Sequence, residues 1–295
     1  MTRTVWLASY PKSGNTWLRM LIANLSVQDA VDINDLPERG GIASARGLFD
    51  QMTLIDSGLL TFDEADCLRP LVYEEMMQGG DVEDDGAPAA PVRFVKVHDA
   101  YTLTAKGEPL LAGARGAAGA IVIVRDPRDV APSLAHHNRS SLDVAISFMN
   151  DANAAFCAKP GREDAQLRQR LTGWSGHVES WLSQTDIPVH LVRYEDLMAD
   201  TAAVLRGALA FAGRDASDAD IARAVAAADF AQLRRQEDEK GFREVPRPHL
   251  RAKFFRRGEV GGWRDELTAE QAARLEQAHA PMMRRLGYGP PGDAR

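Results

Sequence analysis

The chain has 295 residues, and its 42 Asp and Glu outnumber its 35 Lys and Arg, giving a formal net charge of −7. This balance argues against broad non-specific binding of nucleic acid, although it allows a local basic cleft. The two cysteines are far apart in sequence and form no metal-ligand pattern; we expect reduced thiols, and one disulfide is the alternative. The sequence shows no signal-peptide pattern and no apolar run of membrane-spanning length, so we expect a cytoplasmic protein.

Short apolar segments along the chain predict the strands of a parallel sheet. They are rich in Val, Ile and Leu and lack the alternation of a half-exposed strand, which is typical of buried parallel strands. The predicted strands are residues 4–9, 93–97, 120–124 and 189–192.

Amphipathic stretches with capping residues at their starts separate these strands. They predict helices at residues 61–77, 172–183, 201–212 and 217–228, and a last helix that begins at Thr268. Strands that alternate with helices predict an α/β fold with a central parallel sheet flanked by helices. No linker is evident, so we expect residues 1–295 to form a single domain.

Two segments are predicted to be loops. Residues 79–91 are acidic and rich in Gly and Pro, which indicates a surface loop. Residues 236–251 mix charges with Gly and Pro without periodicity, and a long irregular segment of this kind is often a lid or a binding loop. Residues 113–119 carry three regularly spaced glycines, but they precede a strand, so they are not a dinucleotide fingerprint.

The most informative stretch is residues 10–17, between the first predicted strand and an apolar helix. A strand, a turn carrying Lys12, Ser13 and Gly14, and then a helix predict a phosphate site, because backbone N–H groups and the helix dipole favour an anion there. The lysine precedes the glycine, so the spacing fails the Walker A template. The alternative is an ordinary turn with a solvated lysine.

Two arginine-bearing stretches are further candidates for anion binding. Arg125 ends the third predicted strand, where open α/β sheets bind ligands, and Ser133 follows on the next helix. Arg256 and Arg257 precede Gly258, a pattern that suits bidentate phosphate capture with close backbone approach. The alternatives are an Arg125 ion pair with a neighbouring aspartate and a solvated basic turn.

Lys96 and His98 lie at the end of the second predicted strand. Being two residues apart, they share one face if the strand continues through them. Histidine titrates near neutrality and can accept a proton from a hydroxyl group. A hydrogen-bonded structural histidine is the alternative.

Together these stretches resemble the sulfotransferase family that uses 3′-phosphoadenosine 5′-phosphosulfate (PAPS). Residues 10–17 are similar to the family's 5′-phosphosulfate motif Tyr-Pro-Lys-Ser-Gly-Thr-Thr-Trp, and residues 125–133 to its 3′-phosphate segment. Residues 192–197 resemble the segment whose tyrosine meets the nucleotide, and residues 256–263 resemble Arg-Lys-Gly-x-x-Gly-x-Trp. The matches occur in family order.

The resemblance implies a role for each matching residue. Lys12 contacts the bridging oxygen of the donor, His98 is the general base on the acceptor hydroxyl, and Lys96 helps to hold the sulfuryl oxygens. The other implied donor-binding residues are, for the 5′-phosphate, Ser13, Gly14, Asn15 and Thr16; for the adenine, Trp17, Tyr194 and Phe230; and for the 3′-phosphate, Arg125, Ser133, Arg256, Arg257 and Gly258.

Departures from the family pattern raise questions that a structure can answer. Asn15 replaces a threonine, Asp126 replaces a common asparagine beside Arg125, and Asp99 follows the histidine where leucine is usual in animal cytosolic members. The aspartate next to Arg125 could neutralise it in part. The residue after His98 bears on the acceptor pocket more than on the donor site.

The resulting prediction is a sulfotransferase of the P-loop-like nucleotide-binding type. It moves a sulfuryl group from PAPS to a hydroxyl or amine of a small-molecule acceptor and releases adenosine 3′,5′-bisphosphate (PAP), without a metal. The alternatives are a P-loop-type small-molecule kinase using ATP and Mg²⁺, and a non-catalytic nucleotide-binding protein of the same fold. The sequence does not determine the identity of the acceptor or the oligomeric state. The acceptor pocket is expected among residues 33–60, 137–166 and 236–251.

Overall fold

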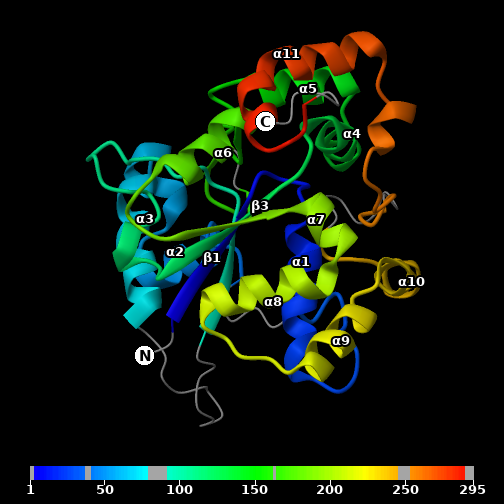
Figure 1. Ribbon diagram of the computed structural model, residues 1–295. Coiled ribbons are helices and arrows are strands. Elements are labelled where there is room, and N and C mark those ends of the chain that lie inside the picture. The colour runs from blue at the N-terminus through cyan, green and yellow to red at the C-terminus, as the bar shows by residue number, and fades with distance from the viewer. Residues whose placement is uncertain (1–2, 37–40, 79–91, 162–163, 245–252, 290–295) are drawn as a thin grey trace.

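A parallel sheet lies at the centre of the protein (Figure 1). The computed structural model describes residues 3–36, 41–78, 92–161, 164–244 and 253–289. The sheet has the order β2-β1-β3-β6, and all of its pairings are parallel. Its strands are β1 (Arg3–Ser9), β2 (Val92–Val97), β3 (Gly119–Val124) and β6 (Val189–Arg193). The strands predicted from the apolar runs are therefore confirmed.

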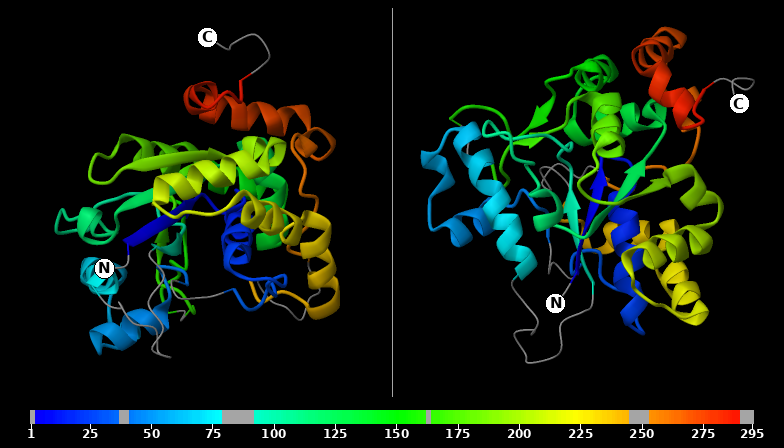
Figure 2. Two further views of the ribbon diagram at one scale, coloured as in Figure 1. Left: turned by 60° about the horizontal axis from the view of Figure 1, so that its bottom comes forward. Right: turned by 60° about the vertical axis from the view of Figure 1, so that its left-hand side comes forward.

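Helices cover both faces of this sheet (Figures 1 and 2). One layer contains α1 (Asn15–Ala23), α7 (Tyr194–Ala199), α8 (Thr201–Ala212), α9 (Asp218–Ala227) and α10 (Phe230–Lys240). The other contains α2 (Arg46–Thr53), α3 (Phe62–Gln78), α4 (Pro127–Asn138), α5 (Leu142–Asn150), α6 (Gly173–Ser183) and α11 (Ala269–Arg285). The 3₁₀ turns are η1 (Asn24–Ser26), η2 (Ser57–Leu59), η3 (Gly113–Arg115) and η5 (Gly262–Asp265).

The strand sequences explain this three-layer arrangement. Successive side chains of a strand point to opposite faces of a sheet. In β1, Trp6 and Ala8 enter the core beneath α3, α4 and α6, whereas Val5 and Leu7 enter the core beneath α1 and α8. Both faces are apolar because both are covered, which is why the strands read as continuous apolar runs.

The strand order places a ligand crevice between β1 and β3. The chain passes from β1 to β2 on one side and later enters β3 on the other side of β1. Open α/β sheets bind ligands at such a switch point, beyond the carboxyl ends of the strands. Lys12 follows β1 and Arg125 follows β3, so the topology brings these two cations to the same crevice.

The predicted loop 79–91 lies outside the described residues, as does 245–251 within the predicted loop 236–251. The start of that second loop was predicted wrongly, because residues 236–240 form the end of α10 and Gln236 and Glu237 are buried. Sequence patterns also missed α2 and α5, together with the two-residue strands β4 (Ala155–Phe156) and β5 (Gln169–Arg170). Within the described ranges, no helix combines the length and apolarity needed to cross a bilayer.

Candidate active site

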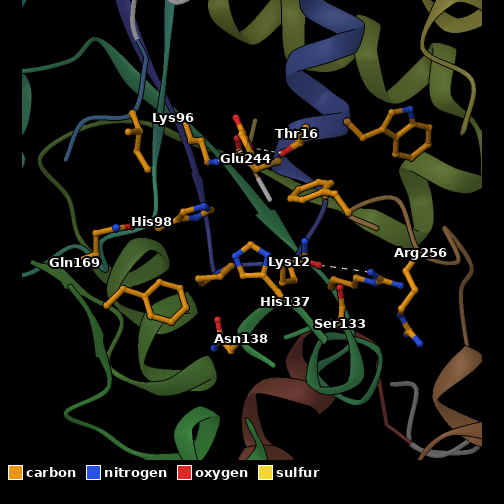
Figure 3. A pocket seen from close by; sticks show the side chains of 18 of the residues that line it. Lys12, Thr16, Lys96, His98, Ser133, His137, Asn138, Gln169, Glu244 and Arg256 are labelled. Carbon is orange, nitrogen blue, oxygen red and sulfur yellow. Dashed lines mark hydrogen bonds and ion pairs between the residues drawn. The ribbon is translucent and has the colours of Figure 1, made fainter. Parts of the chain in front are cut away.

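A cavity of about 1160 Å³ opens at the carboxyl edge of the sheet (Figure 3). Every residue that the sequence predicted for the site lines it except Ser13, which is fully buried. Those residues come from the loops after β1, β2 and β3, from α1, α4, α7 and α10, and from the 254–258 segment. Lys12, Arg125 and Arg256, which come from three separate candidate stretches for anion binding, therefore line the same cavity.

The loop after β1 has a backbone conformation that calls for glycine. Gly14 has φ +106°, and a Cβ atom there would lie 2.6 Å from the ring of Tyr194. Lys12 also has a positive φ, of 71°. The buried hydroxyl of Ser13 has no hydrogen-bond partner among the described residues. The loop therefore packs tightly against α7 and leaves a polar group unsatisfied at the start of α1.

The side-chain amide of Asn15 donates hydrogen bonds to β1, beneath the loop. Its Nδ2 donates to the carbonyl of Leu7 at 2.8 Å and to the hydroxyl of Ser9 at 3.2 Å. Both hydrogens of this amide are thus used within the protein, and the backbone N–H of Asn15 at the helix start is the group that an anion could use. The side chain instead fixes the end of β1, on which the geometry of His98 depends.

His98 is held as a neutral base. Its Nδ1 lies 2.8 Å from the Ser9 carbonyl, which can only accept, so Nδ1 carries the proton and Nε2 keeps its lone pair. Burial, helped by nearby Lys96, lowers the pKa of His98 well below 6.5. At neutral pH the imidazole is therefore uncharged, in the tautomer that a general base requires. Figure 3 shows His98 and Lys96 on the same wall of the cavity, although β2 ends at Val97, one residue before His98.

Lys12 is the cation at the centre of the loop. Its Nζ lies 3.5 Å from the centroid of the Phe254 ring, a cation–π contact. Burial, together with Lys96, lowers the pKa of Lys12 to about 7. Because burial disfavours the charged form, an anion arriving in the cavity would strengthen the protonation of this lysine.

Arg125 is not neutralised by the aspartate that follows it. Its guanidinium lies 4.3 Å from the centroid of the Tyr194 ring and donates to the Glu259 carbonyl at 2.8 Å. The Asp126 carboxylate instead pairs with Arg128 at 2.7 Å. The Nε of Arg125 is buried and has no partner among the described residues. Asp126 therefore does not neutralise Arg125. The ion pair between Arg125 and a neighbouring aspartate, which was the alternative to anion binding, is not formed with Asp126.

The two C-terminal arginines are not simply solvated. Arg256 forms a bidentate pair with Glu266, and Arg257 contacts Glu259 at 3.0 Å and Asp265 at 3.2 Å. These acidic partners hold the guanidinium groups in place while both residues line the cavity.

The turn that carries these arginines is anchored from two sides. The buried Asp129 of α4 accepts hydrogen bonds from the backbone of Gly261 at 2.7 Å and Trp263 at 2.9 Å. Gly258 has φ +65°, and a Cβ atom there would lie 2.5 Å from the Phe230 ring. The turn therefore packs on α10, beside the cavity.

Three aromatic residues lie around the proposed adenine position. Trp17 and Tyr194 meet edge to face, with ring centroids 5.8 Å apart, and the Trp17 indole donates to the Ala228 carbonyl at 2.9 Å. Phe230 lines the cavity at the start of α10. Each ring packs partly against protein and partly on the cavity, which fits both core packing and base stacking.

The other end of the cavity is lined by residues that sequence reasoning did not single out. Phe148 and Phe156 stack at 5.4 Å with an interplanar angle of 14°, and Gln169 lies beside them in β5. Asn138, the last residue of α4, also lines the cavity, whereas its neighbour His137 lies beside Lys12 (Figure 3) and meets the Phe254 ring edge to face. Residues 155–156 and 169–170 come together by antiparallel pairing of β4 and β5, which no apolar pattern signalled.

Arg19 and Glu244 were also missed. The Glu244 carboxylate lies 2.5 Å from Arg19, 3.0 Å from Lys96 and 3.2 Å from the hydroxyl of Thr16. Arg19 follows Thr16 by one helical turn, so its place on the same helix face could have been found from the spacing. Glu244 lies within residues 236–251, which the sequence predicted as a lid or binding loop, but no pattern singled out this residue or its contacts with Arg19 and Lys96.

Asp99, the departure beside His98, is a structural residue. Its Oδ2 lies 2.6 Å from Arg69, both side chains are fully buried, and its Oδ1 accepts from the backbone of Arg170 at 2.9 Å. The pair therefore ties the segment after β2 to α3 and β5. Asp99 supports the backbone next to His98 and does not line the acceptor end of the cavity.

Replacing Asp99 by asparagine should lower the free energy of unfolding by about 3 kcal/mol, because the buried Arg69 guanidinium loses its closer carboxylate partner and keeps only Asp66, at 3.3 Å. Denaturant unfolding measures the loss. Asp218→Asn is the matched control, since Asp218 pairs with Arg206 on the surface, with side-chain exposures of 89% and 53%. That control should change stability by less than about 0.5 kcal/mol. Equal small effects of both variants would contradict the prediction.

Among the described residues, no group of three or more His, Cys, Asp and Glu side chains is arranged to hold a metal ion. Cys67 and Cys157 are not joined in a disulfide.

Comparisons with known proteins identify the family. A family model described as a sulfotransferase domain matches residues 2–287. The chain is 22% identical to cytosolic sulfotransferase 17 of Arabidopsis thaliana, over 92% of this chain and 71% of that one, and 22% identical to the rabbit (Oryctolagus cuniculus) amine sulfotransferase, over 92% and 78%. It is 26% identical to human sulfotransferase 2B1 over 56% of this chain, spanning less than half (44%) of that relative's length.

Solved structures share the fold. The crystal structure of mouse sulfotransferase SULT7A1 complexed with PAP aligns with a TM-score of 0.60 at 19% identity, covering 97% of this chain and 85% of that one. Retinol dehydratase in complex with androsterone and inactive cofactor PAP aligns with a TM-score of 0.57 at 20% identity, covering 95% and 80%. The arrangement of sheet and helices is therefore the nucleotide-binding fold of these proteins, and the match across residues 2–287 shows that the chain belongs to the sulfotransferase family.

Proposed function

We propose that this chain is a cytoplasmic, single-domain enzyme that transfers the sulfuryl group of PAPS to a hydroxyl or amine of a small-molecule acceptor. The observation that supports this most directly is one cavity that contains both a loop suited to a phosphosulfate and a histidine held as a neutral base. Neighbours of the same fold were crystallised with PAP, which supports the choice of donor.

The residues present fit a doubly phosphorylated adenylate. The buried Nε of Arg125, a residue that lines the cavity, lacks a partner among the described residues, as expected for a group that a ligand satisfies. Gly14 and Gly258 bring the backbone close to Tyr194 and Phe230, where a side chain would not fit. We assign the 5′-phosphate to the start of α1 and the 3′-phosphate to Arg125 with Ser133, Arg256 and Arg257.

The proposed chemistry is in-line displacement at sulfur. His98 Nε2 accepts the acceptor's proton as the acceptor atom forms its bond to sulfur, and the bond between sulfur and the bridging oxygen of the donor breaks. Lys12 neutralises the charge that develops on the leaving phosphate, and Lys96 faces the sulfuryl oxygens. Positioning and charge stabilisation carry most of the rate, as they do in phosphoryl transfer.

The acceptor is assigned to the end of the cavity beyond His98. The stacked Phe148 and Phe156 rings offer an apolar platform, and Gln169 and Asn138 offer polar groups beside it. This combination suits a partly apolar molecule that carries a hydroxyl or amine. Retinol dehydratase, a neighbour of the same fold, was crystallised with retinol, which supports an apolar acceptor.

Two ligands separate this proposal from a kinase. PAP should raise the melting temperature of the protein, whereas ATP with Mg²⁺ should not, because the cavity has cations for a 3′-phosphate and lacks the Walker A spacing. A radiolabelled transfer screen with PAPS and a panel of phenols, alcohols and amines then tests catalysis. Stabilisation by ATP–Mg²⁺ alone would favour the kinase, and binding of PAP without any transfer would favour a non-catalytic protein.

Arg256→Ala should weaken PAP binding by about tenfold or more and leave AMP binding nearly unchanged, because a hydrogen bond to a charged group contributes about 1.5–3 kcal/mol. Titration calorimetry with both nucleotides measures the difference. Arg206→Ala, a surface variant on α8, is the control and should change neither affinity. Equal losses for PAP and AMP would argue against the 3′-phosphate role.

A further inference from the structure

A carboxylate of the chain itself lies between two cationic side chains at one corner of the cavity. Glu244 contacts Arg19, Lys96 and the Thr16 hydroxyl, three hydrogen-bond donors from α1 and β2. Figure 3 shows Glu244 between Lys96 and Thr16. Arg19 and Lys96 are each only 12% exposed in their side chains. These donors form a built oxyanion site, because they surround a single carboxylate with charge-assisted hydrogen bonds.

We propose that this oxyanion site, made by Thr16, Arg19 and Lys96, binds the terminal sulfuryl group of the donor, and that Glu244 fills it as an internal competitor until the donor arrives. The proposal rests on the proposed function above. It adds Arg19 as a donor-binding residue and gives Glu244 a role in tuning donor affinity.

The position of Lys96 favours the sulfuryl group over the 5′-phosphate. Lys96 lies two residues before His98, and a base that acts on the acceptor must stand next to sulfur. The carboxylate that bridges Lys96 and Arg19 therefore stands near the sulfur end of the donor. Lys12 and the backbone N–H groups at the start of α1 remain for the phosphate and the bridging oxygen, whereas the Thr16 hydroxyl is assigned to the sulfuryl group.

The electrostatics agree with competition for one site. Although burial opposes it, Lys96 and Arg19 hold the pKa of Glu244 well below its ordinary value of 4.5, so the carboxylate is ionised at neutral pH. A sulfuryl group and an ionised carboxylate cannot both accept hydrogen bonds from Thr16, Arg19 and Lys96 at the same time, because both are anions and would occupy the same position. Binding of PAPS must therefore break the contacts of Glu244. This free-energy cost weakens the binding of PAPS but not that of PAP, which lacks the sulfuryl group.

The test compares PAPS with PAP, by titration calorimetry without acceptor. Glu244→Gln should bind PAPS about tenfold more tightly than the unmodified protein, because the competing charge is gone, whereas its affinity for PAP should be unchanged. Arg19→Met should weaken PAPS and leave PAP unchanged. Glu74→Gln, which removes a comparable charge paired with Arg115 outside the cavity, is the control and should alter neither.

The outcomes separate this inference from the proposed function. If the unmodified protein binds neither ligand, the proposed function and the inference both fail. If PAP binds but Glu244→Gln leaves the ratio of PAPS to PAP affinity unchanged or lowers it, only the inference fails. An equal gain for both ligands would place Glu244 over the phosphate and overturn the sulfuryl assignment. Should Glu244→Gln not fold, Arg19→Met decides by the same ratio.

Discussion

His98→Asn should lower kcat by about 10²–10⁴-fold, the contribution of a general base to a proton-transfer step. Asparagine is the informative replacement because its amide N–H can take the place of the Nδ1–H that donates to the Ser9 carbonyl. The variant therefore keeps the anchor at the end of β1 and removes only the Nε2 lone pair. Steady-state kinetics with saturating PAPS measures the loss.

Binding measurements show whether the lost activity comes from the base. PAP affinity of His98→Asn should equal that of the unmodified protein, since no donor-binding residue has changed. His190→Asn is the matched control: His190 lies on β6, stacks on Phe211 and does not line the cavity, so kcat should stay the same. Unchanged turnover of His98→Asn would remove the base assignment and leave the fold and the donor site intact.

The sheet and the donor loops were predictable because their signals are local. Buried parallel strands must be apolar on both faces, so they stand out as runs, and the turn at residues 10–17 carries its lysine, glycine and helix start within a few residues. The meeting of Lys12 with Arg125 follows from parallel topology, because the carboxyl ends of neighbouring strands share an edge.

Contacts between distant segments could not be read in this way. Phe156 and Gln169 meet through two-residue strands that are too short to show a period, and Glu244 reaches Thr16 from a segment that is remote in sequence. The role of Asp99 was hidden for the same reason, since its partner Arg69 lies on a different element. Arg125 and Asp126 are adjacent in sequence but have different partners: Asp126 pairs with Arg128, two residues further on, and Arg125 donates to the carbonyl of the distant Glu259.

Lys12→Met should lower kcat by about 10²–10³-fold, the cost of removing one group that stabilises developing negative charge. Methionine keeps an unbranched apolar side chain of similar length but has no ammonium to lie over the Phe254 ring, so the loss reports the positive charge together with this cation–π contact. Lys106→Met, an exposed lysine in a surface turn, is the control and should leave kcat unchanged. A change in KM for PAPS at constant kcat would mean that Lys12 only binds the donor.

The pH dependence of donor binding tests the same lysine independently of turnover. Burial and Lys96 lower the pKa of Lys12 to about 7, and the anionic donor must raise it, because it favours the charged form. Above neutral pH, binding therefore takes up a proton, and PAP affinity should fall by up to about tenfold per pH unit between about pH 7 and 9. In Lys12→Met this slope should vanish. A slope that survives the substitution would assign the titration to another group and remove Lys12 from contact with the leaving phosphate.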